Sequence, residues 1–214
     1  MITSDVNSSD LKLNNPNTLV YVMPDVEGIR KETTAQSSRL YAANYLSEDD
    51  LIMTCDMDLL PLSDYWHPSS DNITVYGHDL TWFSYFPMGY CAMTGKKWKQ
   101  KLQLTGDTKA DMERDFKEVK IAYSGDWEKW WNHDWQLLTN RLMPFKDELT
   151  MINRGQINIA GATLAKGRID RFNFMETQNQ PEPFIDAHCE NNNVQHPVKL
   201  EPFLKMYEKY VGKL

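Results

Sequence analysis

One stretch decides more about the fold of this chain than any other: LIMTCDMDLLPL, residues 51–62. Its first five residues form an apolar run that suits a buried strand, and Asp56 and Asp58 follow it closely. Two carboxylates one residue apart at a strand end reach the same crevice if the chain turns there. Such oxygen ligands suit Mn²⁺ or Mg²⁺, and a cation held in this way binds a diphosphate. The plainer interpretation is a solvated turn.

Other apolar runs predict the rest of an α/β fold. The run Thr18–Met23 (TLVYVM) predicts a first strand, and Pro24 ends it. The other predicted strands lie at residues 51–55, 72–76, 89–93 and 156–160. The predicted helices lie at residues 32–46, 109–121, 134–143 and 201–210. We therefore expect a polar tail over residues 1–17 and one domain over residues 18–214, with a mixed central sheet of about six strands and helices on both faces.

Composition excludes some classes of partner. The net charge of −7 argues against nucleic acid, because binding phosphates requires clustered Lys and Arg. The seven Trp and ten Tyr suit either stacking on ring-shaped ligands or core packing. Cys55, Cys91 and Cys189 have neither zinc nor disulfide spacing, which fits a reducing compartment. With no signal-peptide pattern and no long apolar run, we expect a cytoplasmic protein without a membrane segment.

A phosphatase is one alternative for the same carboxylates. Haloacid-dehalogenase-type phosphatases also place Asp-x-Asp after a strand, with the first Asp as nucleophile and Mg²⁺ as cofactor. Residues 106–111 (GDTKAD) imitate their later acidic motif. However, Leu60 stands where that family has Thr or Val, and Pro61 is unexpected. The run before the later motif, KQKLQLT, is polar rather than a buried strand. The phosphatase is thus the second choice, with Asp56 as its nucleophile.

Four segments together resemble glycosyltransferases of the GT-A fold. They are the Asp-x-Asp strand, FPMGYCAMTGKKW at residues 86–98, NHDWQLLTNRL at residues 132–142 and IDAHCEN at residues 185–191. The resemblance implies that Gly89 forms the floor of the sugar pocket and that Asp134 faces the acceptor or the reacting sugar. It also implies that His188 completes the metal site beside Asp56 and Asp58.

More narrowly, the chain resembles the N-terminal glycosyltransferase domain of large chlorella-virus proteins implicated in glycosylating the major capsid protein. That resemblance implies Mn²⁺, a UDP-sugar donor and transfer of a hexose or deoxyhexose with retention. The acceptor would be a glycan or glycoprotein such as the capsid protein, in the host cytoplasm, and further domains would follow this one.

Each implied role has a plainer alternative. An imidazole is a good third ligand for Mn²⁺, but His188 would also suit a local hydrogen bond. Asp134 opens a predicted helix and so also suits a cap. As a catalytic residue, Asp134 would be the base of an inverting enzyme, or it would position substrate in a retaining one. The residues leave both roles open.

Contacts to the nucleotide are predicted at five positions. Arg39, on the helix before the Asp-x-Asp strand, would bind the donor, or it would be a solvated helix charge. Tyr21 and Met23, with Pro24, would line the uracil pocket, and Lys199 would reach a phosphate. The aromatic residues between Tyr76 and Phe86 suit either an acceptor cleft or the core. A third hypothesis is a sugar-binding module without catalysis, which would bind glycans but not UDP.

Overall fold

The computed structural model describes most of the chain between residues 18 and 188. The described residues are 18, 20–56, 59–80, 85–86, 90–123, 133–159, 161–170, 177, 184–188, 205 and 208–209. Three predicted site residues, Asp58, Gly89 and Lys199, lie outside this set, as does the predicted tail over residues 1–17. Of the helix predicted at residues 201–210, only residues 205, 208 and 209 are described, and all three are helical.

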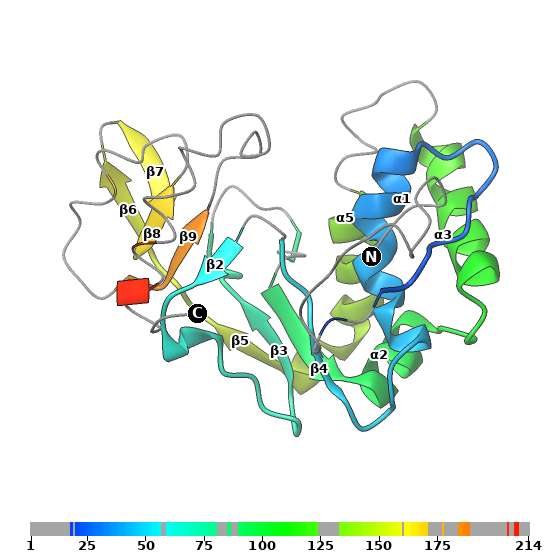
Figure 1. The fold of residues 1–214 in the computed structure, drawn as a ribbon, viewed down its shortest axis with the longest axis horizontal. Helices are drawn as coiled ribbons and strands as arrows, with labels where there is room; N and C mark the ends of the chain where they lie inside the picture. The colour runs from blue at the N-terminus through cyan, green and yellow to red at the C-terminus, as the bar shows by residue number, and fades with distance from the viewer. Residues whose placement is uncertain are drawn as a thin grey trace.

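A mixed four-stranded sheet forms the centre of the described structure, in the order β1-β4-β3-β5 (Figure 1). The four strands are β1 (Leu51–Met53), β3 (Ile73–Tyr76), β4 (Cys91–Thr94) and β5 (Leu149–Ile152). Strand β4 pairs antiparallel with β1 and β3, while β5 runs parallel to β3. The sequence ITVY of β3 is rich in β-branched side chains, and its four residues are all buried, as expected of an inner strand.

The two faces of this sheet pack against different layers. Ile73 and Val75 of β3 belong to the large core cluster under the helices. Tyr76 and Ala92 point the other way and pack with Leu59, Trp66 and Tyr90. This alternation follows from the two-residue period of a strand, and it places the aromatic cluster between the four-stranded sheet and the smaller sheet.

The helices gather beside β4, at the right of Figure 1, and supply one side of the main core. The α-helices are α1 (Lys31–Ser37), α2 (Gly95–Leu102), α3 (Thr108–Tyr123) and α5 (His133–Leu142). The 3-10 helices are η2 (Ser38–Asn44), η3 (Asp64–Trp66) and η5 (Met143–Glu148). None of the helices in the described ranges has the length and apolar character that crossing a membrane requires.

Helix α2 begins directly at the end of β4, and the local sequence explains this tight junction. The Thr94 hydroxyl accepts a hydrogen bond from the Lys97 amide at 3.4 Å and so caps the helix. A Cβ on Gly95 would lie 2.2 Å from the Ser47 carbonyl oxygen, so only glycine fits at the first position.

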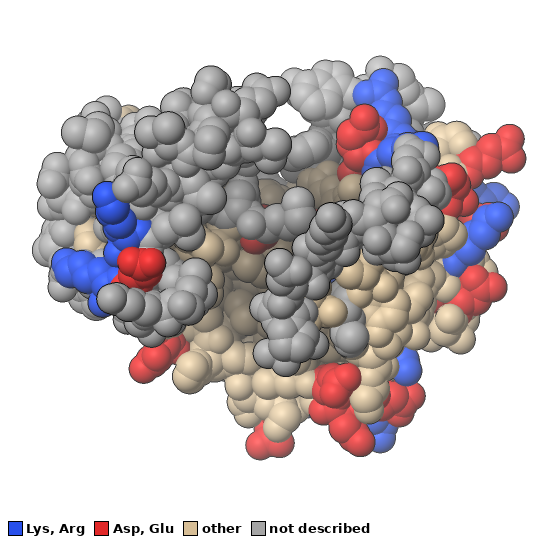
Figure 2. All heavy atoms as spheres, viewed as in Figure 1, with Lys and Arg blue, Asp and Glu red and all other residues tan. Residues whose placement is uncertain are grey.

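Over the helical part of the face shown in Figure 2, basic and acidic side chains are mixed.

A smaller sheet and a hairpin lie beyond β5. The smaller sheet has the order β2-β9-β8, formed by β2 (Leu59–Pro61), β9 (Asp186–His188) and β8 (Arg168–Asp170). The hairpin consists of β6 (Gln156–Ile159) and β7 (Ala162–Ala165). Strand β9 is the centre of the smaller sheet, antiparallel to β2 and parallel to β8.

The predicted α/β class is confirmed, but the predicted layout is not. Among the described residues the strands divide into sheets of four, three and two rather than one sheet of about six. Gly155, Gly161 and Gly167 all have positive φ, which suits sharp turns. The chain reverses at these glycines, and the strands that follow β5 join the hairpin and the smaller sheet instead of the central sheet. Pro61 lacks an N–H group and therefore suits an edge strand such as β2. The smaller sheet occupies the face on which we expected a second layer of helices.

The strand predicted at Thr18–Met23 is wrong: among its described residues, 18 and 20–23, a single β-bridge at Val22 is the one strand-like pairing. Met23 is instead buried in the main core, and Tyr21 stacks on Tyr45 with ring centroids 4.5 Å apart. The helix predicted at residues 32–46 is confirmed as α1 followed by η2. The strands and helices predicted around β1, β3, β4, β6, α3 and α5 are also confirmed, with small shifts of their ends.

Candidate functional site

Asp56 lies where β1 ends and the chain turns toward the smaller sheet. The Thr54 amide donates to the Cys91 carbonyl at 2.9 Å, which extends the pairing with the neighbouring strand past Met53. The Leu59 amide then donates to the Asp56 carbonyl at 3.2 Å, so the start of β2 is tied back to the end of the β1 segment. The side chain of Asp56 is about one-third exposed, at 32%.

Arg39 joins Asp56 to Asp134, two residues that are far apart in the sequence. Its Nη1 donates to Oδ1 of Asp56 in a short hydrogen bond. Its Nη2 and Nε donate to Oδ2 of Asp134 at 2.7 Å and 3.2 Å. Because its neighbours Leu40 and Tyr41 are buried in or against the core, η2 holds Arg39 at the end of the sheet. Three residues that were predicted separately are thus brought into one ionic cluster.

The electrostatics of this cluster favour a permanently charged Arg39. Burial lowers the pKa of the guanidinium, but the charges and hydrogen bonds of Asp134 and Asp56 outweigh it, and the net pKa is raised above its ordinary value. Burial raises the pKa of Asp134 to about 6, and Arg39 opposes this rise. At neutral pH Asp134 is therefore mainly ionised, and it titrates close to the physiological range.

Asp134 is more enclosed than the sequence indicated. Its side chain has no exposed surface. Besides Arg39, which binds Oδ2, the amide of Trp135 donates to Oδ1 at 2.9 Å. The carboxylate therefore contacts the site through Arg39 and does not line an open cleft. In this arrangement Asp134 positions the guanidinium that holds Asp56.

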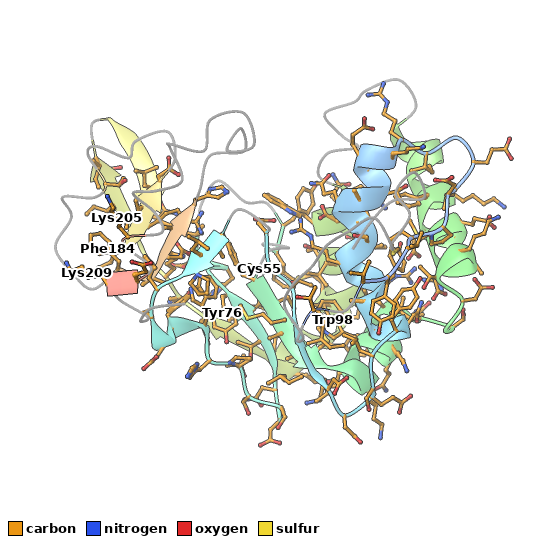
Figure 3. The ribbon with its side chains drawn as sticks, viewed as in Figure 1. Cys55, Tyr76, Trp98, Phe184, Lys205 and Lys209 are labelled. Atoms are coloured by element: carbon orange, nitrogen blue, oxygen red, sulfur yellow. The ribbon has the colours of Figure 1, made fainter. Side chains whose placement is uncertain are left out.

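A cavity of about 370 Å³ opens beside Arg39 and the end of β1. Its lining includes Tyr21, Tyr45, Ile52, Thr54 and Cys55. The volume falls within the range of roughly 300–1,000 Å³ that is typical of small-molecule sites, and the mostly apolar walls carry few polar groups. Figure 3 places Cys55 between the helices and the smaller sheet, with Trp98 among the helices and Tyr76 below the smaller sheet.

The three predicted uracil contacts, Tyr21, Met23 and Pro24, occupy two different places. Tyr21 lines the cavity beside Arg39, and its hydroxyl donates to the Tyr45 carbonyl at 3.1 Å. Met23 and Pro24 instead line a second, more open hollow of about 590 Å³ on the other side of Tyr45, near Lys109. Met23 is only 1% exposed, so it serves mainly as a core residue.

His188 lies one strand away from the Asp56 turn. It is the last residue of β9 and pairs directly with Leu59 of β2, whose amide binds the Asp56 carbonyl. Paired residues in antiparallel strands have Cα atoms about 5 Å apart. The sheet thus places His188 on the strand next to the Asp-x-Asp segment, 132 positions along the chain from Asp56.

The donor chemistry at this place fits a divalent cation. Arg39 binds only Oδ1 of Asp56, and among the described residues no hydrogen bond to Oδ2 is present. One carboxylate oxygen and an imidazole from the adjacent strand are ligands that Mn²⁺ accepts. The described part of the chain contains no complete group of three His, Cys, Asp or Glu side chains around one cation position. Asp58, the predicted second carboxylate, lies outside that part.

One buried network was not predicted at all. The carboxylate of Asp186, on β9, accepts hydrogen bonds from both Arg154 and Arg168, and Arg168 also donates to the Tyr90 hydroxyl. Burial acts to raise the pKa of Asp186, but the two guanidinium groups outweigh it and hold the pKa well below its ordinary value. Burial also raises the pKa of Tyr90, and the negative charges of Asp186 and Asp56 add to the rise. Tyr90 therefore contacts this network through Arg168 and also feels the charge of Asp56.

Of the two interpretations of the aromatic residues between Tyr76 and Phe86, an acceptor cleft or the core, the core holds at both end positions. Tyr76 is fully buried in the aromatic cluster, and Phe86 packs in the main core. Asp79, between them, accepts hydrogen bonds from the amides of Arg154 and Gly155, both at 2.8 Å. The carboxylate fixes the turn after β5.

The phosphatase-like motif at residues 106–111 also has a structural role. Asp111 is buried, and its oxygens accept hydrogen bonds from Thr105, Asn44 and Arg114. Its hydrogen bonds thus join the first turn of α3 to the loop before it and to η2.

Comparisons with known protein families, with curated proteins and with solved structures found no match for this chain. The interpretation of the site therefore depends on its own geometry and on the residues that the sequence singled out.

Proposed function

We propose that this chain is a metal-dependent glycosyltransferase that moves a hexose or deoxyhexose from a UDP-sugar to a glycan acceptor. The observation that carries the proposal is the link between Asp56, Arg39 and Asp134 at the edge of a cavity that suits a small molecule. The sequence predicted these three residues for one site from separate signals. A GT-A domain and a viral glycoprotein acceptor belong to the same proposal.

In this proposal the cavity holds the nucleoside and the Asp56 turn lies under the diphosphate. Tyr21 and Tyr45 supply aromatic rings in the lining of the cavity. Asp56, Asp58 and His188 would hold Mn²⁺, which when bound supplies positive charge against the pyrophosphate. Arg39 binds Oδ1 of Asp56 and so restricts the orientation of that carboxylate.

Asp134 keeps Arg39 in place and supplies a negative charge behind it. With retention of configuration, Asp134 would act by positioning Arg39 and, through it, Asp56. With inversion, a carboxylate would have to reach the acceptor hydroxyl directly. Because Asp134 is enclosed and bonded through both oxygens, its position supports the first role better.

Nucleotide-dependent thermal stability tests the proposal directly. UDP at about 100 times its dissociation constant, with Mn²⁺ present, should raise the free energy of unfolding by roughly 2.7 kcal/mol. GDP and CMP at the same concentration should have little effect, and chelation of the metal should remove the effect of UDP. Stabilisation by free glycans that is insensitive to both chelator and UDP would instead support a sugar-binding module.

The thiol of Cys55 offers a local test of where the nucleotide binds. Cys55 is exposed and lines the cavity, whereas Cys91 is fully buried. UDP with Mn²⁺, at ten times its dissociation constant, should slow alkylation of Cys55 about tenfold. Peptide mass spectrometry measures the rate at each cysteine, and Cys91 should stay unreactive throughout. If UDP stabilises the protein but leaves the Cys55 rate unchanged, the nucleotide binds elsewhere.

A further inference from the structure

We propose that Asp170 is a positioning residue that orients His188 for the cation. Nothing in the sequence pattern singled out Asp170, which ends the short strand β8. In the parallel pairing of β8 with β9, Asp170 lies directly beside His188. The inference rests on the proposed function, because it assigns a role toward the metal that the function requires.

The two side chains project from the same face of the smaller sheet. Two positions earlier in the same pair of strands, Arg168 lies beside Asp186, and the Arg168 Nε donates to Asp186 Oδ1 at 3.0 Å. Because side chains alternate between faces, residues two positions further along both strands share the face of that ion pair. Ile169 and Ala187, between them, are fully buried on the opposite face.

This shared face points toward the candidate site. Leu59, which pairs with His188 on its other side, packs against the aromatic cluster that includes Tyr90. Arg168 reaches the Tyr90 hydroxyl from the same face. His188 therefore lies between Asp170 on one neighbouring strand and the segment that follows Asp58 on the other.

The environment of Asp170 suits a fixed hydrogen-bond acceptor. The residue is only 7% exposed, and its amide donates to the Thr177 hydroxyl at 3.0 Å, which fixes the backbone there. An imidazole that binds a metal through one nitrogen commonly donates its other N–H to a carboxylate, which fixes the tautomer and the plane of the ring. Asp170, which pairs with His188 in the register of β8 and β9, would accept that hydrogen bond when the imidazole binds the cation.

The test measures binding of Mn²⁺ alone, by electron paramagnetic resonance or calorimetry, with no donor sugar present. Asp170→Asn should weaken binding by about 10–100-fold, the usual effect of losing such a partner. Asp71→Asn is the matched control, because Asp71 is exposed and the substitution removes the same charge. It should bind Mn²⁺ as the wild type does.

A double-mutant cycle separates positioning from a general structural role. If Asp170 acts through His188, Asp170→Asn should weaken Mn²⁺ binding much less in a His188→Ala background than in the wild type. Equal effects in both backgrounds would overturn the inference. Asp170→Glu, which moves the carboxylate by one methylene, replaces the Asn variant if that variant does not fold, and wild-type affinity in it would also overturn the inference.

Mn²⁺ binding distinguishes failure of the proposed function from failure of the role of Asp170. If the wild-type protein binds no Mn²⁺ in the presence or absence of UDP, the proposed function fails, and the role of Asp170 fails with it. If the wild type binds Mn²⁺ and Asp170→Asn binds it equally well, the proposed function stands and only the role of Asp170 is rejected.

Discussion

Replacing Asp186 with asparagine should lower the free energy of unfolding by about 3–5 kcal/mol. The carboxylate is fully buried and is the partner of two guanidinium groups, on Arg154 and Arg168. Asparagine keeps the shape but removes the negative charge, so both arginines stay buried with uncompensated positive charge. Since natural domains have free energies of unfolding of only about 5–15 kcal/mol, this single change would remove a large part of the stability.

Urea unfolding at neutral pH measures the effect, and its pH dependence identifies the cause. The pKa of Asp186 in the folded protein lies below the ordinary value of 3.8, so its contribution to stability is present above that value and is lost as the pH falls through the folded pKa. The difference in free energy of unfolding between wild type and variant should therefore be largest at neutral pH and become smaller in acid. A variant as stable as Asp71→Asn at pH 7 would contradict the importance of the network.

The same network explains how the smaller sheet positions His188. Asp186 and His188 lie two residues apart on β9, and the ion pairs of Asp186 hold that strand against β8 and the turn after β5. Partial loss of the network should therefore loosen the strand that carries the predicted metal ligand. Mn²⁺ binding by a folded Asp186→Asn protein should be weaker than in the wild type for that reason.

Local patterns in the sequence predicted the parts of the site that depend on one segment. The apolar run before Asp56 predicts β1, because a run of apolar residues reflects which side chains are buried. The run Thr18–Met23 shows the limit of this argument. An apolar segment that packs against helices has the same composition as one that pairs in a sheet.

Local sequence patterns could not predict contacts between distant segments. Arg39 and Asp134 are 95 positions apart, and as single residues each had an ordinary explanation, as a solvated helix charge and as a helix cap. Arg168 and Asp186 also lie in different segments, and charged residues are usually exposed, so nothing local indicated that they are buried together. Only the register of the smaller sheet places Asp170 beside His188.

Asp134→Asn should lower the turnover of a UDP-sugar donor by about 10²–10³-fold, the usual range for removing one preorganised polar group from an active site. The neutral amide cannot balance the charge of Arg39, so the guanidinium should lose its fixed position between Asp134 and Asp56. Release of UDP from the donor measures turnover without knowledge of the acceptor. We expect the loss mainly in kcat, with a smaller change in KM, because Asp134 has no surface that touches the donor.

The pH profile distinguishes this positioning role from simple damage to the fold. The pKa of Asp134 is about 6, so wild-type turnover should fall as the pH drops through that value and the carboxylate becomes neutral. Asparagine does not titrate, so the low turnover of this variant should not fall further as the pH drops through that value. Arg39→Lys is a useful companion, because an ammonium group cannot reproduce the forked hydrogen bonds to two carboxylates, and it should lose turnover as well. Wild-type kcat in Asp134→Asn, with the acid step retained, would show that the carboxylate behind Arg39 has no part in the reaction.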